Sequence, residues 1–229
     1  YGTSSLSFSS DIDLVVVAQT VEGFSQIQTD FQNFLNELKK LLFPFQVDFR
    51  LRPEGNKSPL VIDISNYDDY LSERARLWEF QSLLKLRFVD GDKGLYTKLR
   101  KLIIKHFDRF ESNHISREMM NMYKLIQSQQ IKTSGSGVNI KKDRGTLMTI
   151  DFIVQSLIFK NKAILKDIIG KSTPSMFKII MRIASDSDTK ILYANYKYLK
   201  KIEILIQNIF NLDNTLIPQD SDKRGIISR

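Results

Sequence analysis

The strongest constraint on the fold is a pair of strand-like segments near the amino end of the chain. Residues 12–18 read IDLVVVA, a continuous apolar and β-branched run, which predicts a buried strand. Residues 45–51 read FQVDFRL and alternate, so they predict a half-buried strand with Asp48 on its polar face. Between them, apolar residues at helical spacing predict a helix over residues 24–43 that ends at Pro44. The first part of the chain therefore mixes short strands with one helix.

The character of the sequence changes after Ser65, where helical periodicity becomes dominant. Residues 60–64, LVIDI, predict one more short strand before this change, and the SGSG segment at 134–137 predicts a flexible break between helices. The predicted helices span 67–88, 95–110, 116–130, 149–159, 174–184 and 189–210. We expect an α+β fold with two domains, in which a small mixed sheet with helices (residues 1–115) precedes a helical bundle (residues 116–229).

Composition narrows the kinds of site that this chain can build. It has no cysteine and two histidines, which excludes disulfides and thiolate metal sites and leaves carboxylates as ligands, favouring magnesium over zinc. No segment approaches the roughly 20 apolar residues of a membrane span, and no signal peptide opens the chain, so a cytoplasmic protein without membrane contact is expected. Residues 1–64 carry a formal charge of −3 and the remainder +11. No aromatic and basic stacking pattern accompanies that charge, so no nucleic-acid partner is expected.

Three aspartates carry the candidate chemistry. Asp11 and Asp13 lie two residues apart at the edge of a predicted strand, so their carboxylates point to the same side. Asp48 could join them across the sheet, and three carboxylates suffice to hold two magnesium ions in phosphoryl or nucleotidyl transfer. The small polar turn Gly2–Ser5 could cradle a triphosphate with its backbone N–H groups. A lone Asp-x-Asp motif is more often a solvated surface feature than a catalytic one. Catalysis is favoured here because the Gly2–Ser5 turn precedes the motif, a buried strand carries it and a second strand presents Asp48.

The sequence around these residues resembles a known family. Residues 1–17, YGTSSLSFSSDIDLVVV, are similar to the signature of the glutamine synthetase adenylyltransferases, which belong to the DNA polymerase β-like nucleotidyltransferases. The resemblance continues in VDFRLRPEGNKSPLV (47–61), in WEFQSLLKLRFVDGD (78–92) and, more faintly, in VNIKKDRGTLMTIDFIVQ (138–155). These blocks occur in the order and spacing of the family.

The resemblance implies a role for each matching residue. Asp11, Asp13 and Asp48 match the metal-binding and catalytic carboxylates. The residues implied to bind the nucleotide are Gly2, Thr3, Ser10, Arg50 and Arg52, with Thr3 standing where the family has a second glycine. Two alternatives stay open for Arg52: it contacts phosphate, or it pairs with Glu54 or Glu79. Trp78 is interpreted as a packed aromatic anchor rather than a platform for adenine.

The implied activity is transfer of an adenylyl group between ATP and a tyrosine of glutamine synthetase, with Mg²⁺ as cofactor. The expected partners are glutamine synthetase, ATP and a nitrogen-signalling regulatory protein. Members of the family carry an adenylylating and a deadenylylating copy of this domain. The tryptophan block is closer to the adenylylating copy, whereas SSDIDL (9–14) and SPLV (58–61) are closer to the other, so both directions stay open, with adenylylation slightly favoured. The alternative is a degenerate regulatory domain that binds a nucleotide or partner without turnover. It is motivated by departures at Asn139, Thr149 and Asp151 and by the expectation that a strand preceding the first turn is missing.

Overall fold

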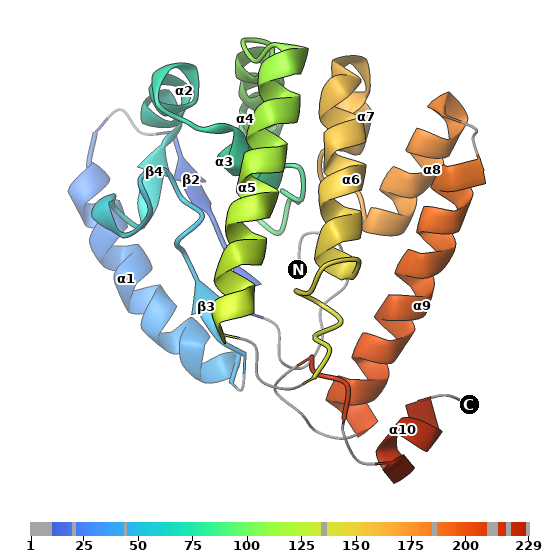
Figure 1. The fold of residues 1–229 in the computed structure, drawn as a ribbon. Coiled ribbons are helices and arrows are strands. Elements are labelled where there is room, and N and C mark those ends of the chain that lie inside the picture. The colour runs from blue at the N-terminus through green and yellow to red at the C-terminus, as the bar shows by residue number, and fades with distance from the viewer. Residues whose placement is uncertain are drawn as a thin grey trace. The chain divides into compact units, whose positions relative to one another are not determined.

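The computed structural model describes residues 11–19, 22–43, 45–133, 137–184, 187–209, 215–218 and 221–227. Gly2, Thr3, Ser10 and Pro44 lie outside the described residues, as does most of the SGSG segment. The α+β class is confirmed: short parallel strands stand near the amino end, and helices make up the rest (Figure 1). Within the described part of the chain, no helix is both long and apolar enough to cross a membrane.

The chain divides into two compact units. Among the described residues, unit 1 contains 11–109 together with Ile169–Lys171, and unit 2 contains 110–168 and the residues from Ser172 onward. The predicted domains, 1–115 and 116–229, stay a prediction, because a group of residues in mutual contact need not fold independently.

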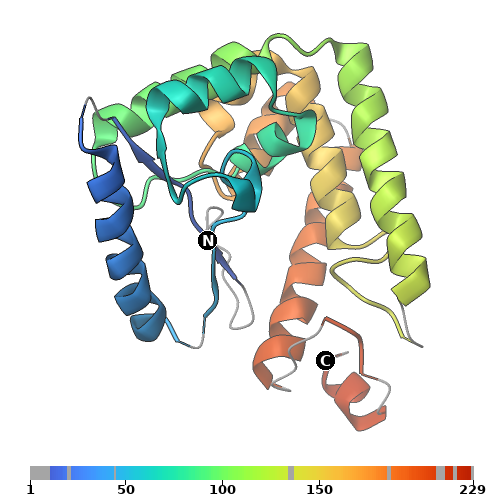
Figure 2. The ribbon, with the colours of Figure 1, turned by 90° about the vertical axis from the view of Figure 1, so that its left-hand side faces the viewer.

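Unit 1 holds the strands. Its elements are β1 (Ile12–Asp13), β2 (Val16–Ala18), α1 (Phe24–Leu41), β3 (Val47–Asp48), β4 (Val61–Asp63), α2 (Ile64–Glu73), α3 (Leu77–Leu83) and α4 (Lys93–Phe107), with a 3₁₀ turn at Gly55–Lys57. β1 pairs with β3 and β2 pairs with β4, both in parallel, whereas a mixed sheet was expected. The predicted continuous strand over 12–18 is wrong: the chain leaves the first ladder after Asp13 and enters the second at Val16. Figure 2 shows α1 beside this group of strands.

The helices of unit 1 pack through aromatic and aliphatic side chains. Phe80 of α3 meets Phe107 of α4 at 5.7 Å between ring centroids, and both rings are fully buried. Phe31 of α1 meets Phe49, which directly follows β3, at 5.8 Å. The predicted helix over 67–88 is two helices, because α2 ends at Glu73 and Arg76 has an extended backbone before α3 begins at Leu77. Phe34 and Leu41 on the predicted apolar face of α1 are exposed.

The amide of Gln28 links α1 to the outer edge of β4. Its Nε2 donates to the carbonyl of Val61 at 2.6 Å, and its Oε1 accepts from the N–H of Val61 at 3.2 Å. The Gln28 side chain thus makes the two hydrogen bonds to the Val61 backbone that a neighbouring strand would otherwise make. The outer edge of this ladder is therefore satisfied at Val61 without another strand.

Replacing Gln28 by leucine is expected to lower the free energy of unfolding by about 1–3 kcal/mol, because both backbone groups of Val61 lose their partner in a half-buried place. Urea unfolding of the full chain measures this. The matched control is Gln26→Leu two residues earlier on α1, since Gln26 is exposed and its side chain donates to the exposed Asp30. Equal stabilities of the two variants would contradict the edge role of Gln28.

Unit 2 is helical. Its helices are α5 (Ser112–Thr133), α6 (Leu147–Lys160), α7 (Leu165–Ile168), α8 (Thr173–Ile183), α9 (Ser187–Ile209) and α10 (Ser221–Ile227), with a 3₁₀ turn at Lys162–Ile164. Helix α6 packs against α5, α8 and α9 through Ile150, Val154 and Ile158, which are almost fully buried. Phe177 of α8 contacts the rings of Tyr193 and Tyr196 of α9. The unit is thus a bundle built around α6.

Candidate active site

The register of the first ladder brings two of the three aspartates together. Ile12 pairs with Val47 and Asp13 pairs with Asp48, and the ladder is closed by hydrogen bonds from Ile12 N to Gln46 O (2.7 Å) and from Leu14 N to Asp48 O (2.8 Å). Ile12 is buried while Asp11 and Asp13 on either side of it are exposed, as strand alternation predicts. Asp13 and Asp48 are therefore neighbours on adjacent strands, and Asp11 precedes them on the same segment.

Arg50 binds Asp48 in this arrangement. Its Nε donates to Asp48 Oδ2 at 2.6 Å, its Nη2 lies 2.5 Å from the same oxygen, and its backbone N–H donates to Oδ1 at 2.8 Å. The side chain of Asp48 is mostly covered, whereas that of Arg50 is 69% exposed. Both carboxylate oxygens of Asp48 thus accept hydrogen bonds from Arg50. The exposed guanidinium of Arg50 has room to turn away from Asp48 toward solvent.

The charges of this group affect one another. Although Asp13 is exposed as a residue, partial desolvation of its carboxylate raises its pKa, and the neighbouring charges of Asp48 and Asp11 raise it further. The hydrogen bond from Arg50 lowers the pKa of Asp48, against the opposing effect of burial. The hydrogen bond and charge of Asp48 raise the pKa of Arg50, and Asp11 and Asp13 add to that effect. Asp11, Asp13, Asp48 and Arg50 form one electrostatic cluster.

Arg52 takes a different place from Arg50. The strand ends at Asp48, so the chain turns before Arg52 and its side chain is buried rather than aligned with that of Asp48. Its Nη1 donates to the carbonyl of Phe49 at 2.7 Å and its Nε to that of Ser58 at 3.1 Å. Contact with phosphate would require Arg52 to leave both carbonyls, so its nucleotide-binding role stays a prediction. Glu54 instead pairs with Arg74 Nε at 3.0 Å, and Glu79 accepts from the Tyr70 hydroxyl.

A network beside this turn was missed by the sequence reasoning. Tyr70 of α2 donates through its hydroxyl to Glu79 Oε1, and Glu79 Oε2 accepts from the backbone N–H of Arg76 at 2.7 Å. Burial and the bond to Glu79 raise the pKa of Tyr70 to about 12. The available signal was Glu79 itself, because a glutamate at the third position of a helix commonly caps its start.

The carboxylates fit a magnesium ion by donor type and, for one pair, by position. Magnesium is bound by carboxylate oxygens, which Asp13 and Asp48 present at the same level of the ladder. Over the ranges that the structure describes, no group of three or more His, Asp or Glu side chains is arranged to hold a metal ion. Arg50 bonds to both carboxylate oxygens of Asp48, so a cation at this residue would have to displace it. Magnesium binding by the three aspartates stays a prediction.

Trp78 is 44% exposed at the start of α3, so its interpretation as a packed anchor is wrong.

Two of the residues that depart from the family pattern lie in the block at 138–155. Asn139 Oδ1 accepts from the backbone N–H groups of Lys141 and Lys142, both at 3.0 Å. Thr149 Oγ1 accepts from Gly145 N at 2.8 Å and bonds to the Tyr123 hydroxyl. Asn139 and Thr149 thus stabilise local turns in unit 2.

The ion pair on Asp48 predicts a pH-dependent contribution to stability. Because the folded-state pKa of Asp48 is lowered, the pair stabilises above the ordinary value of 3.8 and is lost as the pH falls through the lower folded value. Arg50→Gln should therefore be slightly less stable than the parent protein at about pH 6 and equally stable near pH 2. Chemical unfolding across that range measures this, with Lys40→Gln, which breaks an exposed pair with Glu37, as control. A difference that persists at the acid end would contradict the assignment.

A comparison with protein families adds to this geometry. A family model described as glutamate-ammonia ligase adenylyltransferase matches residues 1–102. The matched region contains all three aspartates, both arginines and the tryptophan block, while the block at 138–155 lies beyond it. The family that the sequence resembles is confirmed over this region, glutamate-ammonia ligase being another name for glutamine synthetase. Residues 1–102, a little under half of the chain, are therefore similar to the glutamate-ammonia ligase adenylyltransferase family.

Proposed function

We propose that this chain transfers an adenylyl group between ATP and a tyrosine hydroxyl of glutamine synthetase, using the cluster of Asp11, Asp13 and Asp48. The observation that carries the proposal is the register of β1 and β3, which sets Asp13 directly beside Asp48 within the region matched by the family. Paired carboxylates on adjacent strands are suited to divalent cations, and the adjoining Arg50 is suited to phosphate.

In this proposal Asp13 and Asp48 hold magnesium, and Asp11 completes the ligand set. Two bound magnesium ions would supply neutralisation of charge on the attacking and leaving oxygens. Arg50 leaves Asp48 and donates its planar N–H groups to the triphosphate, for which its exposed side chain is free to turn. The turn at Gly2–Ser5, with Ser10, would hold the remaining phosphate oxygens through backbone and hydroxyl donors.

The proton of the attacking hydroxyl needs an acceptor, and Asp48 is the proposed one. While Arg50 is bound to it, the lowered pKa of Asp48 makes it a weak base. Departure of Arg50 removes the largest cause of that lowering. The same movement would therefore free a carboxylate oxygen of Asp48 for the cation and place a donor at the phosphates.

The test compares binding with turnover in the full chain. We expect ATP to bind only with Mg²⁺ or Mn²⁺ in calorimetry, and labelled adenylyl to appear on glutamine synthetase when both are present. Pyrophosphate release identifies the adenylylating direction, while phosphate-dependent release of ADP from modified glutamine synthetase identifies the reverse one. Absence of metal-dependent ATP binding would exclude the proposal.

A second candidate function is a regulatory domain that binds nucleotide without turnover. It is favoured by the engagement of Asp48 with Arg50 and by the lack of a three-carboxylate metal group in the described ranges. The same experiment separates the two, because this candidate predicts metal-dependent ATP binding with no transfer in either direction.

A further inference from the structure

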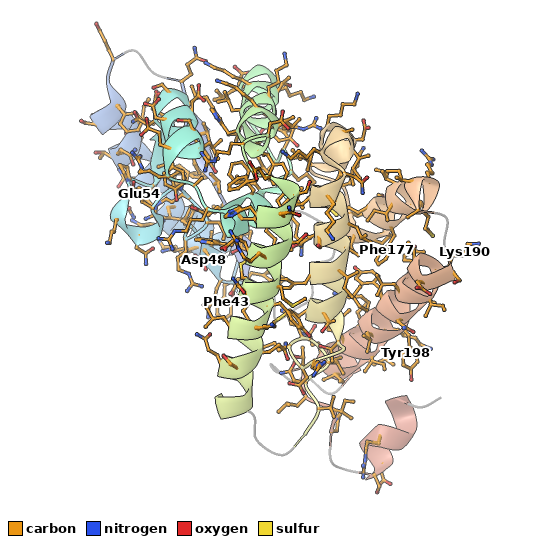
Figure 3. All side chains as sticks on the ribbon, turned by 45° about the horizontal axis from the view of Figure 1, so that its top comes forward. Phe43, Asp48, Glu54, Phe177, Lys190 and Tyr198 are labelled. Carbon is orange, nitrogen blue, oxygen red and sulfur yellow. The ribbon has the colours of Figure 1, made fainter. Side chains whose placement is uncertain are left out.

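The peptide group that joins Phe49 to Arg50 makes hydrogen bonds on both of its sides. Its N–H, that of Arg50, donates at 2.8 Å to Oδ1 of Asp48, the residue labelled on β3 in Figure 3. Its carbonyl oxygen, that of Phe49, accepts from Arg52 Nη1 at 2.7 Å and from the Arg52 backbone N–H at 3.2 Å. Because a peptide group is planar, turning its carbonyl also turns its N–H. The contacts that hold the carbonyl therefore also set the direction in which the N–H meets the carboxylate of Asp48.

The Arg52 side chain is placed to keep this peptide group still. Its Nε donates to the carbonyl of Ser58 at 3.1 Å, so one guanidinium joins the residue directly after β3 to the segment that leads into β4. A guanidinium presents its donors in a rigid planar fork, whereas a lysine ammonium does not. The ring of Phe49 also packs against that of Phe31 of α1 at 5.8 Å. Phe49 is thus held both through its carbonyl and through its side chain.

Burial distinguishes Arg52 from Arg50. Arg52 is 8% exposed and its guanidinium is bonded to two carbonyl oxygens, so a phosphate could reach it only if the segment 49–58 opened. The Arg50 side chain is mostly exposed and can turn without any such change. Burial lowers the pKa of Arg52, and the charge of Asp48 opposes that effect. Arg52 is therefore better suited to holding backbone groups beside Asp48 than to binding ATP.

We propose that Arg52 is a positioning residue, which orients the carboxylate of Asp48 for the cation through the peptide group between Phe49 and Arg50. The inference rests on the proposed function, in which Asp48 holds magnesium. When the Arg50 side chain leaves Oδ2, its backbone N–H stays on Oδ1 and keeps Oδ2 turned toward the cation. Arg52 touches neither ATP nor the cation, and its guanidinium stays on the two carbonyls throughout.

The first experiment compares Arg50→Gln with Arg50→Gln, Arg52→Lys in the full chain. The glutamine background removes the guanidinium that competes with a cation for Oδ2 of Asp48 but keeps the backbone N–H. Lysine at position 52 keeps the charge and loses the fork. We expect Mn²⁺, added without ATP, to bind about tenfold more weakly to the double variant, as loss of an outer hydrogen-bond partner typically causes. Electron paramagnetic resonance of free Mn²⁺ measures the binding. Faster exchange of the amide at position 50, measured by NMR, should accompany it.

Arg109→Lys in the same background is the matched control. Arg109 belongs to unit 1 and, like Arg52, donates to backbone carbonyls, those of Leu71, Ser72 and Ala75 at the end of α2. A general loss of stability should lower the melting temperature of both lysine variants. The loss of Mn²⁺ affinity should appear only with Arg52→Lys, and an equal loss in the control would overturn the positioning role.

A second measurement uses the parent protein and does not depend on the folding of any variant. NMR follows hydrogen exchange at the Nε–H groups of Arg50 and Arg52 as Mg²⁺·ATP is added. We expect the Nε–H of Arg52 to keep its protection, because its bond to Ser58 persists, while that of Arg50 changes as it leaves Asp48. If the Nε–H of Arg52 lost its protection on addition of Mg²⁺·ATP, Arg52 would be a phosphate ligand and the inference would be wrong.

The results distinguish the inference from the proposed function. Unchanged Mn²⁺ affinity after Arg52→Lys would overturn the positioning role and leave the proposed function intact. The same holds if the Arg50→Gln protein bound no Mn²⁺ although the parent bound Mn²⁺·ATP, because Asp48 would then not be oriented before ATP arrives. If the parent bound no Mn²⁺·ATP at all, the proposed function would fail and the inference with it.

Discussion

Replacing Asp13 by asparagine is expected to reduce adenylyl transfer by more than about 100-fold while raising the melting temperature at neutral pH. Asparagine keeps the size of the side chain and its place on β1 beside Asp48, but it lacks the second anionic oxygen that a cation would share. Activity and stability should therefore move in opposite directions, which is the pattern of a functional residue placed at a cost in stability.

The sign of the stability change follows from the pKa of Asp13. Burial raises it above the ordinary 3.8, and Asp48 and Asp11 add to the rise, so folding opposes ionisation of this carboxyl group. The unfavourable contribution develops as the pH rises through the ordinary value and is complete above the raised folded value. A neutral side chain at position 13 should thus stabilise near pH 7 and make no difference near pH 2, where the parent residue is also neutral.

Asp69→Asn is the matched control for Asp13→Asn. Asp69 lies exposed on α2 in the same unit, outside the carboxylate cluster, so its replacement should change neither transfer nor melting temperature appreciably. The combined Asp11→Asn, Asp13→Asn protein provides the stricter condition. If that double variant kept full transfer activity, the assignment of the cluster would be wrong.

Gly170→Ala is expected to lower the free energy of unfolding by about 2–4 kcal/mol. Gly170 has φ +81°, and a Cβ there would lie 2.7 Å from the carbonyl oxygen of Leu86 and 3.0 Å from the Tyr96 hydroxyl. The carbonyl belongs to the backbone and cannot turn away. Its own N–H also donates to Leu84 O at 3.0 Å, so moving the glycine would break a hydrogen bond.

Gly145→Ala separates the two contributions to this loss of stability, which are backbone strain at positive φ and the steric clash of the added Cβ. Gly145 has nearly the same φ, +84°, yet a Cβ there would meet nothing within 4 Å. Its replacement reports the backbone strain alone, about 1 kcal/mol. Thermal or urea unfolding of both variants gives the difference due to the clash with Leu86 and Tyr96. If both variants lost the same free energy of unfolding, the segment at Gly170 would have moved away from Leu86 O without cost, which would contradict the steric clash.

The part of the site that follows from strand periodicity could be predicted from the sequence. Alternation around Ile12 set Asp11 and Asp13 on one side, and the polar face of the second strand supplied Asp48, which the register then placed beside Asp13. The α+β class followed in the same way from the change in periodicity after Ser65. Local pattern is sufficient here because strand faces are determined by neighbours in sequence.

The remaining features depend on where a strand or helix stops. Arg52 shares the alternation of Arg50, but β3 ends at Asp48 and the turn buries Arg52 against two carbonyls. The break between α2 and α3 carries neither glycine nor proline to mark it. The left-handed conformation of Glu54 (φ 57°) was equally hidden, since neither glycine nor asparagine stands at this position to mark it. Tertiary contacts decide such endings, and a single sequence does not display them.

The membership of Ile169–Lys171 in unit 1 has a practical consequence for anyone who shortens this protein. A version ending near residue 115 would retain every proposed catalytic side chain but would uncover the carbonyls of Leu84 and Leu86, which Gly170 otherwise covers. Weak activity in such a truncated version would then reflect a missing packing partner, and it would say nothing against the aspartates. The shortest version that preserves the carboxylate unit has to extend through Lys171.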